Sequence, residues 1–195
     1  MKLHNKGFIM TAVLAGLMLP AVAQTTPTIN ERKENQQDRI ANGIQDGQLT
    51  PGETKSLEKK ESNLNQEERD MRKLDNGRLT SADRTTLNQQ QNKLSQDIYK
   101  DKHNSRVQNV DPKSEVGQRE RLQQERIAQG VRSGQLTSGE AAHLEGREQH
   151  INREIHNDRM ANGGTLTPAE RRQVNHQENR TSKAIYQKKH NGRVQ

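Results

Sequence analysis

The sequence predicts an all-α protein: a tandem duplication of a three-helix unit whose long antiparallel helices form coiled-coil-like hairpins around a thin core. Three observations predict this class. The chain repeats itself at a fixed interval, helix-start motifs recur within each copy, and apolar residues are few. Of the 195 residues, 27% are hydrophobic and 2% aromatic. After position 23, only 29 of 172 residues are large and apolar, which is near the fraction where disorder becomes common.

The tandem duplication is the strongest internal signal. When the chain is shifted by 87 residues, residues 36–108 align without a gap with residues 123–195, and 35 of the 73 aligned positions are identical. Both copies carry Lys-His-Asn near their ends and close with Arg-Val-Gln. A repeat of this length indicates one structural unit present twice.

A shorter motif, Gly-x-Leu-Thr-x-x-Glu or Asp, occurs twice in each copy and predicts helix starts. A Thr followed three residues later by an acid forms a capping box, in which each side chain accepts a hydrogen bond from the other residue's backbone N–H. The preceding Gly suits the left-handed residue that ends a helix. The shorter side chain of Asp83 makes its box the weakest. The predicted caps are Thr50 with Glu53, Thr80 with Asp83, Thr137 with Glu140, and Thr167 with Glu170.

These motifs divide the chain into six helices. We expect them at residues 32–42, 51–74, 81–104, 119–129, 138–161 and 168–191. The predicted layout is a signal peptide at 1–23, a flexible leader at 24–31, helical repeats at 32–108 and 119–195, and a linker at 109–118. Within the second helix Leu57, Leu64 and Met71 recur once per heptad, with polar residues between them. This narrow stripe favours a coiled-coil seam.

The N-terminal segment 1–23 predicts export. Two lysines precede an apolar run over residues 8–19, and the small residues Ala21 and Ala23 precede a cut before Gln24. The run is shorter than the roughly 20 residues that span a bilayer. We therefore expect a periplasmic or secreted protein with no transmembrane segment after signal removal. Since the chain has no cysteine, we expect neither a lipid anchor nor a disulfide.

Calcium binding is one alternative that the motif raises, because Gly-x-Leu-Thr-x-x-Glu resembles the second half of an EF-hand loop. With Gly47 at the turn, Asp46 and Glu53 fall at ligand positions. The third loop position is then Ile44, which has no side-chain oxygen to offer. Helix capping explains the same residues without a metal.

Histidines raise a second alternative, a transition-metal site. No two of them have the i, i+4 spacing of a helical pair, although His103 and His190 occupy equivalent positions that symmetry could bring together. We assign no metal ligand and no cofactor. The histidines after the signal are His103, His143, His150, His156, His176 and His190.

Basic residues gather at the end of each copy and raise a third alternative, polyanion binding. In the second copy they include Lys188, Lys189 and Arg193. Acidic residues are interleaved with them, as on an ordinary solvated helix face. We expect no nucleic-acid partner, because the chain offers almost no aromatic surface for stacking on bases.

The sequence contains no catalytic motif. It has no cysteine nucleophile, no Gly-x-Ser-x-Gly elbow, no phosphate-binding glycine loop and no His-Glu-x-x-His. Carboxylates are abundant, but we expect a thin core to leave them solvated with ordinary pKa values. We therefore expect a protein that is not an enzyme.

At the four Leu-Thr-x-x-acid motifs the chain resembles the LTxxQ-motif periplasmic proteins, the Spy/CpxP-like family. The matching pairs are Leu49-Thr50, Leu79-Thr80, Leu136-Thr137 and Leu166-Thr167. This sequence has Glu or Asp where the family has Gln. The resemblance implies an exported, dimerising helical chaperone or envelope-stress sensor. The chain also resembles uncharacterised exported helical-repeat proteins, which imply no function.

These observations favour an exported, non-enzymatic helical protein that acts through protein–protein interaction and is chaperone-like or related to envelope stress. Its partners would be other proteins or further copies of itself. The alternatives are envelope metal binding, through the histidines or EF-hand-like sites, and polyanion binding.

Overall fold

The structure is a computed structural model that describes residues 27–107, 111 and 113–193. Within these residues the chain is all-helical, which confirms the predicted class, and no helix there is long and apolar enough to cross a membrane. The helices are α1 (Ile29–Gln45), α2 (Pro51–Leu74), α3 (Ser81–Lys102), α4 (Glu115–Arg132), α5 (Ser138–Ala161) and α6 (Pro168–Lys189). The predicted signal peptide, including Ala21, Ala23 and Gln24, lies outside the described residues.

Capping boxes begin the four long helices. The Thr50 hydroxyl accepts a hydrogen bond from the Glu53 backbone, and the Glu53 carboxylate accepts one from the Thr50 backbone at 3.0 Å. Boxes of the same kind lie at Thr137 and Thr167. Asp83 also completes its capping box despite its shorter side chain, because its carboxylate accepts a hydrogen bond from the Thr80 backbone N–H at 2.8 Å. The Gly three residues before each Thr has φ between 66° and 98°, which confirms the predicted left-handed turns.

The two shorter helices begin earlier than the sequence pattern suggested, at Ile29 and Glu115 rather than near residues 32 and 119. Thr28 caps α1 with a fifth capping box, in which Glu31 accepts the Thr28 amide at 2.7 Å. Ser114 caps α4 by accepting from the Gly117 backbone at 3.0 Å. Both helices therefore start inside the stretches expected to form the leader and the linker.

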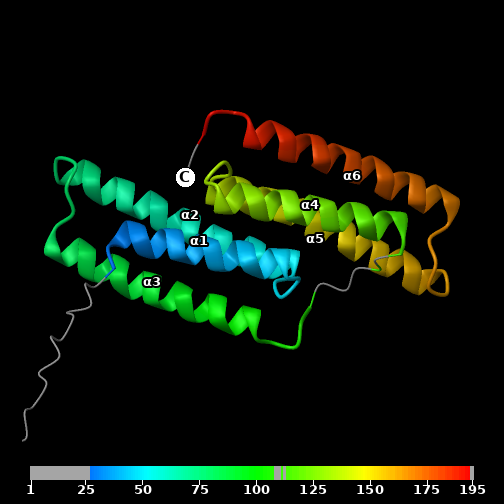
Figure 1. Ribbon diagram of the computed structural model, residues 1–195, viewed down its shortest axis with the longest axis horizontal. Helices are drawn as coiled ribbons and strands as arrows, with labels where there is room; N and C mark the ends of the chain where they lie inside the picture. Colours follow the sequence, from blue (N-terminus) through cyan, green and yellow to red (C-terminus); the bar gives the residue numbers. More distant parts are fainter. Residues whose placement is uncertain (1–26, 108–110, 112, 194–195) are drawn as a thin grey trace, which may run out of the picture.

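Four helices, α1, α2, α4 and α5, form the centre of the molecule (Figure 1). The hairpin partner α3 packs on α1 and α2, while α6 packs on α4 and α5, and α3 does not contact α6. We call residues 27–107 the first half and residues 113–193 the second half. The bounds of α5 and α6 lie 87 residues after those of α2 and α3, so the halves have the same helix order.

The two halves meet where α2 lies along α5 and α1 lies along α4. Gly52 on α2 is approached by the side chain of Gln149 on α5. Gly139 on α5 is approached in the same way by Ser62 on α2. The start of each helix thus faces the middle of the other, so α2 and α5 run antiparallel.

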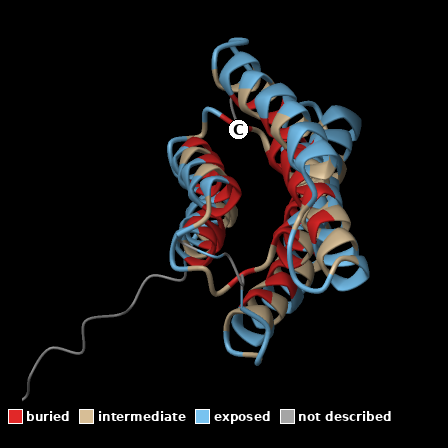
Figure 2. Cartoon of the chain, turned by 90° about the vertical axis from the view of Figure 1, so that its right-hand side faces the viewer, coloured by how far each residue is buried: buried red, intermediate tan, exposed pale blue. Residues whose placement is uncertain are grey.

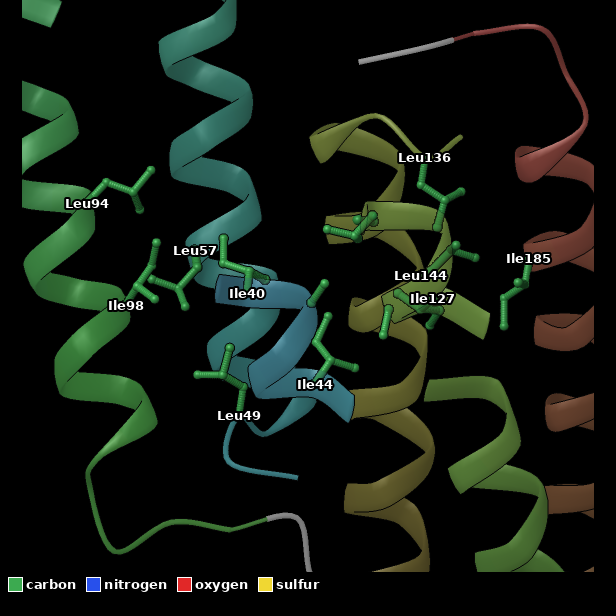
Figure 3. Packing of buried hydrophobic residues seen from close by; sticks show 14 residues of the cluster. Ile40, Ile44, Leu49, Leu57, Leu94, Ile98, Ile127, Leu136, Leu144 and Ile185 are labelled. Atoms are coloured by element: carbon green, nitrogen blue, oxygen red, sulfur yellow. The ribbon is translucent and has the colours of Figure 1, made fainter. Parts of the chain in front are cut away.

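One apolar cluster crosses this junction (Figure 3). Buried residues concentrate on the faces that the helices turn toward one another (Figure 2). A smaller cluster of Val116, Ile151, Ile155 and Val174 lies in the second half. The main cluster consists of Ile40, Ala41, Ile44, Leu49, Leu57, Leu94, Ile98, Ile127, Ala128, Val131, Leu136, Ala141, Leu144 and Ile185.

Candidate functional site

Glutamates occupy seam positions of α2 and α5 where a coiled coil would place apolar residues. In α2 the seam runs Leu57, Glu61, Leu64, Glu68 and Met71, with the alternating spacing of four and three that brings residues to one helix face. The seam of α5 likewise alternates apolar residues with Glu148. This pattern directs acids into the interior when the two helices pair.

Four buried glutamates form what we call the carboxylate layer: the seam residues Glu61 and Glu148, and Glu58 and Glu145, which follow the seam leucines. Glu58 and Glu61 lie on α2, and Glu145 and Glu148 occupy the equivalent positions on α5. Their exposed fractions are between 0 and 1%. Glu is almost never buried to this degree unless it is paired with a cation. The layer is thus the most unusual feature of the junction between the halves.

The carboxylate layer receives amide hydrogen bonds. The side-chain amide of Gln37 donates to Glu58 at 3.3 Å, and that of Gln124 donates to Glu145 at 3.2 Å. Among the described residues, the Oε1 atoms of Glu58 and Glu145 have no hydrogen-bond partner. An ionised carboxylate held this way would be strongly destabilising, whereas a protonated one is far less so.

Burial raises the pKa of both central carboxyls to about 8. For Glu58 the next cause is the negative charge of Glu61, and for Glu145 the hydrogen bond from Gln124 opposes the rise. Burial raises the pKa of Glu61 to about 7, against the opposing charge of Lys33. Burial, followed by the charge of Glu145, also raises the pKa of Glu148. Glu58, Glu61 and Glu145 are therefore neutral at mildly acidic pH and become charged between about pH 7 and 8.

Cations border the layer at its two ends. Lys33, whose charge acts on Glu61, donates to Glu68 on α2 at 2.9 Å. In the second half Arg119 lies 2.9 Å from the buried Glu178, whose pKa is still raised to about 7 by burial. Neither pair supplies a cation to Glu58, and among the described residues no ion pair holds Glu58 or Glu145 in its charged form.

These pKa values correct one expectation from the sequence. A thin core was expected to leave the carboxylates solvated, yet pairing of α2 with α5 desolvates Glu58 and Glu145 completely. Raised pKa values often mark catalytic sites. Here the two carboxyls are 0% exposed, so a substrate cannot reach them in the closed structure. The chemistry that this arrangement supports is proton binding coupled to contact between the halves.

The acids of the half EF-hand motif are engaged in structural contacts. Beyond its capping box, Glu53 accepts from Asn104 at 2.8 Å, and Glu140 accepts from Asn191 at 2.6 Å. These bonds tie the residues after α3 and α6 back to the starts of α2 and α5. Within the described residues no group of three or more His, Asp or Glu side chains is placed to hold a metal ion.

The equivalent histidines remain apart. His103 stacks on Tyr99 and His190 stacks on Tyr186, with ring centroids 4.2 Å apart in both pairs. Each pair lies at the end of an outer helix, and Figure 1 shows α3 and α6 on opposite sides of the molecule. The pseudo-symmetry of the chain therefore does not bring the two rings together.

The basic end of the second half is partly neutralised. Lys188 lies 3.9 Å from Glu140, and Lys189 donates to Gln129 at 3.0 Å. Burial and the neighbouring Arg126 lower the pKa of Lys189. Lys188 therefore has an acidic neighbour, whereas Lys189 contacts a neutral amide.

Comparisons with known proteins do not place the chain in a family. No protein-family model, no curated protein and no solved structure matches it. The functional inference therefore depends on the residues of this chain and their arrangement.

Proposed function

We propose that this chain is an exported, non-enzymatic helical protein, a tandem duplication of a three-helix unit, that acts through protein–protein interaction in the periplasm or outside the cell. The specific role we propose is chaperone-like binding of partly unfolded proteins under envelope stress. The observation that carries the proposal is the junction between the halves, where a buried ionisable layer lies beside residues of the apolar cluster. The signal-like N-terminus and the resemblance to the LTxxQ-motif proteins support it.

The junction supplies a way to expose apolar surface. Leu57 and Leu144 occupy the same helices as the carboxylate layer, one residue before Glu58 and Glu145, and both leucines are 0% exposed. When the layer ionises, like charges meet at low dielectric and the junction is weakened. Separation of α2 from α5 would then expose apolar side chains able to bind an unfolded segment.

A disulfide across the junction tests this role with a matched control. A Cβ placed on Gly139 lies 3.3 Å from the Ser62 hydroxyl, close enough for a cysteine pair at these positions to form a disulfide. The chain contains no cysteine of its own, so Ser62→Cys with Gly139→Cys creates a single possible bond. The oxidised protein is locked closed, and the reduced protein is free to open.

The assay is suppression of heat-induced aggregation of a client such as citrate synthase near pH 8. We expect the wild type and the reduced double variant to suppress aggregation and the oxidised variant to fail. Equal suppression by both forms would refute opening at the junction. A client that aggregates unchanged at a molar excess of wild-type protein would refute the chaperone role itself.

A further inference from the structure

The second half contains a cationic groove between α5 and α6 that the carboxylate layer does not involve. Its volume is about 490 Å³, within the range of small-ligand sites. Arg147 and Arg180 face it from the two helices of the hairpin, and Lys55 reaches it from α2 of the first half. The floor includes the buried side chains of Ile151 and Thr181.

The cations of this groove have little compensation. Among the described residues, the side chains of Arg147 and Arg180 make no hydrogen bond or ion pair, and no carboxylate lines the groove. Glu154 does not line the groove, but it contacts two residues that do, accepting from Gln177 at 2.7 Å and lying 3.8 Å from His150. The groove thus concentrates three permanent positive charges around a partly enclosed space.

The groove also contains two histidines beside its three permanent cations. His143 and His150 line it together with the arginines. Burial, followed by the positive charges of Lys188 and Arg147, lowers the pKa of His143. The neutral form of His143 is therefore favoured, and the positive charge of the groove comes from the lysine and the two arginines.

The first half provides an internal comparison, because the equivalent groove between α2 and α3 is neutral. It has a volume of about 260 Å³, and Lys60 and Lys93 take the positions of the two arginines. Two carboxylates line it, and one of them, Asp97, forms an ion pair with Lys60 at 2.8 Å. The residue equivalent to Asp97 in the second half is Ala184. The two copies therefore differ in the acid that neutralises the groove.

Gly146 lies where the Lys55 side chain of the first half crosses α5. A Cβ placed on Gly146 would lie 3.5 to 3.7 Å from the end of the Lys55 side chain, which is ordinary van der Waals contact, so Lys55 packs against α5 at this residue. Lys55 also donates to Gln149 at 3.4 Å, which holds it over the groove. The residue equivalent to Lys55 in the second half is Ala142, which cannot supply a cation to the first groove in the same way.

We infer that the groove between α5 and α6 binds a small multivalent oxyanion that carries two or more phosphate-type groups. Arginine side chains present paired N–H donors that match the oxygens of such groups, and a lysine adds a point charge. The separation of the cations over two halves favours an ion with several charged groups over a single phosphate. Binding would also link the halves, since Lys55 and Arg147 come from different ones.

Calorimetry with inorganic tripolyphosphate, at neutral pH and physiological salt, tests the inference. We expect saturable binding at one site. Arg147→Gln with Arg180→Gln should weaken it by at least about tenfold, the effect of losing charge-assisted hydrogen bonds. The matched control, Lys60→Gln with Lys93→Gln in the first groove, should change the affinity by less than about twofold, as expected for an already neutralised site.

A reciprocal variant guards against misfolding as an explanation. Ala184→Asp introduces the acid that neutralises the first groove and should weaken binding while circular dichroism stays unchanged. Vesicles containing phosphatidylglycerol provide a second probe. We expect Arg147→Gln to leave any binding of the protein to these vesicles unchanged. Absence of tripolyphosphate binding, equal losses in both variant pairs, or binding only to the vesicles would overturn the inference.

Discussion

Replacing both central carboxyls by amides, Glu58→Gln with Glu145→Gln, should make the protein more stable at pH 8 and leave it nearly unchanged at pH 5. Glutamine has the shape of a protonated glutamic acid but cannot ionise. The pKa of each carboxyl rises from 4.5 to about 8 on folding. At about 1.36 kcal/mol per pKa unit, ionising one carboxyl in the closed state therefore costs roughly 5 kcal/mol more than in the unfolded chain. Two such groups reach about 10 kcal/mol, comparable with the whole stability of a domain.

The sign of the pH dependence follows from proton linkage. Between pH 4.5 and about 8 the folded protein binds more protons at Glu58 and Glu145 than the unfolded chain does. Unfolding free energy therefore falls as pH rises through this interval and levels off above it. On the acidic side a hydrogen bond from Lys60 lowers the pKa of Asp97, and its stabilisation is lost as pH falls below about 4. Maximum stability should lie near pH 5.

The assay is urea unfolding followed by circular dichroism near pH 5, 6.5 and 8. At pH 8 we expect the double variant to exceed the wild type by at least about 2 kcal/mol, or by about 5 °C in Tm for a chain of this size. Glu34→Gln is the matched control, because Glu34 is exposed and makes no hydrogen bond or ion pair within the described residues. A wild type whose stability is flat between pH 5 and 8 would refute the reasoning.

Two further predictions concern the helices themselves. Thr50→Ala and Thr167→Ala should each lower the unfolding free energy by about 1 kcal/mol, as N-cap losses do, and an unchanged urea midpoint would count against the caps. Gly130→Ala should cost about 1–3 kcal/mol by overpacking, since its Cβ would lie 2.7 Å from the buried Leu136 side chain. Gly146→Ala should leave the unfolding free energy unchanged or raise it in the same urea experiment, because its Cβ would make only ordinary contacts beyond 3.4 Å. Equal losses of unfolding free energy for the two glycine variants would contradict the close packing at Gly130.

The features that the sequence predicted well are local ones. Caps at Thr50 or Thr137 and left-handed glycines depend on residues within one turn, so their motifs can be recognised directly. Thr28 with Glu31 carries the same Thr-x-x-Glu signal but lacks the preceding Gly-x-Leu, and for that reason the early start of α1 was missed.

The carboxylate layer could not be predicted in this way, because its burial depends on which helices pair across 87 residues of sequence. An isolated helix with Glu58 and Glu61 looks like an ordinary solvated face. One available signal was that Glu58 and Glu61 align with Glu145 and Glu148, although only 35 of the 73 aligned positions are identical. The substitution of Asp97 by Ala184 was likewise visible, but its place in a groove required the hairpin geometry.

The most direct test of the account is the distance between α2 and α5 as a function of pH. Spin labels on Lys59→Cys and Asn157→Cys, both exposed, report on it without touching the carboxylate layer. We predict one narrow distance distribution at pH 5 and a broader, longer one at pH 9 that reverts on acidification and is absent when Glu58 and Glu145 are both replaced by Gln. The same narrow distribution at both pH values would contradict the claim that ionisation opens the junction.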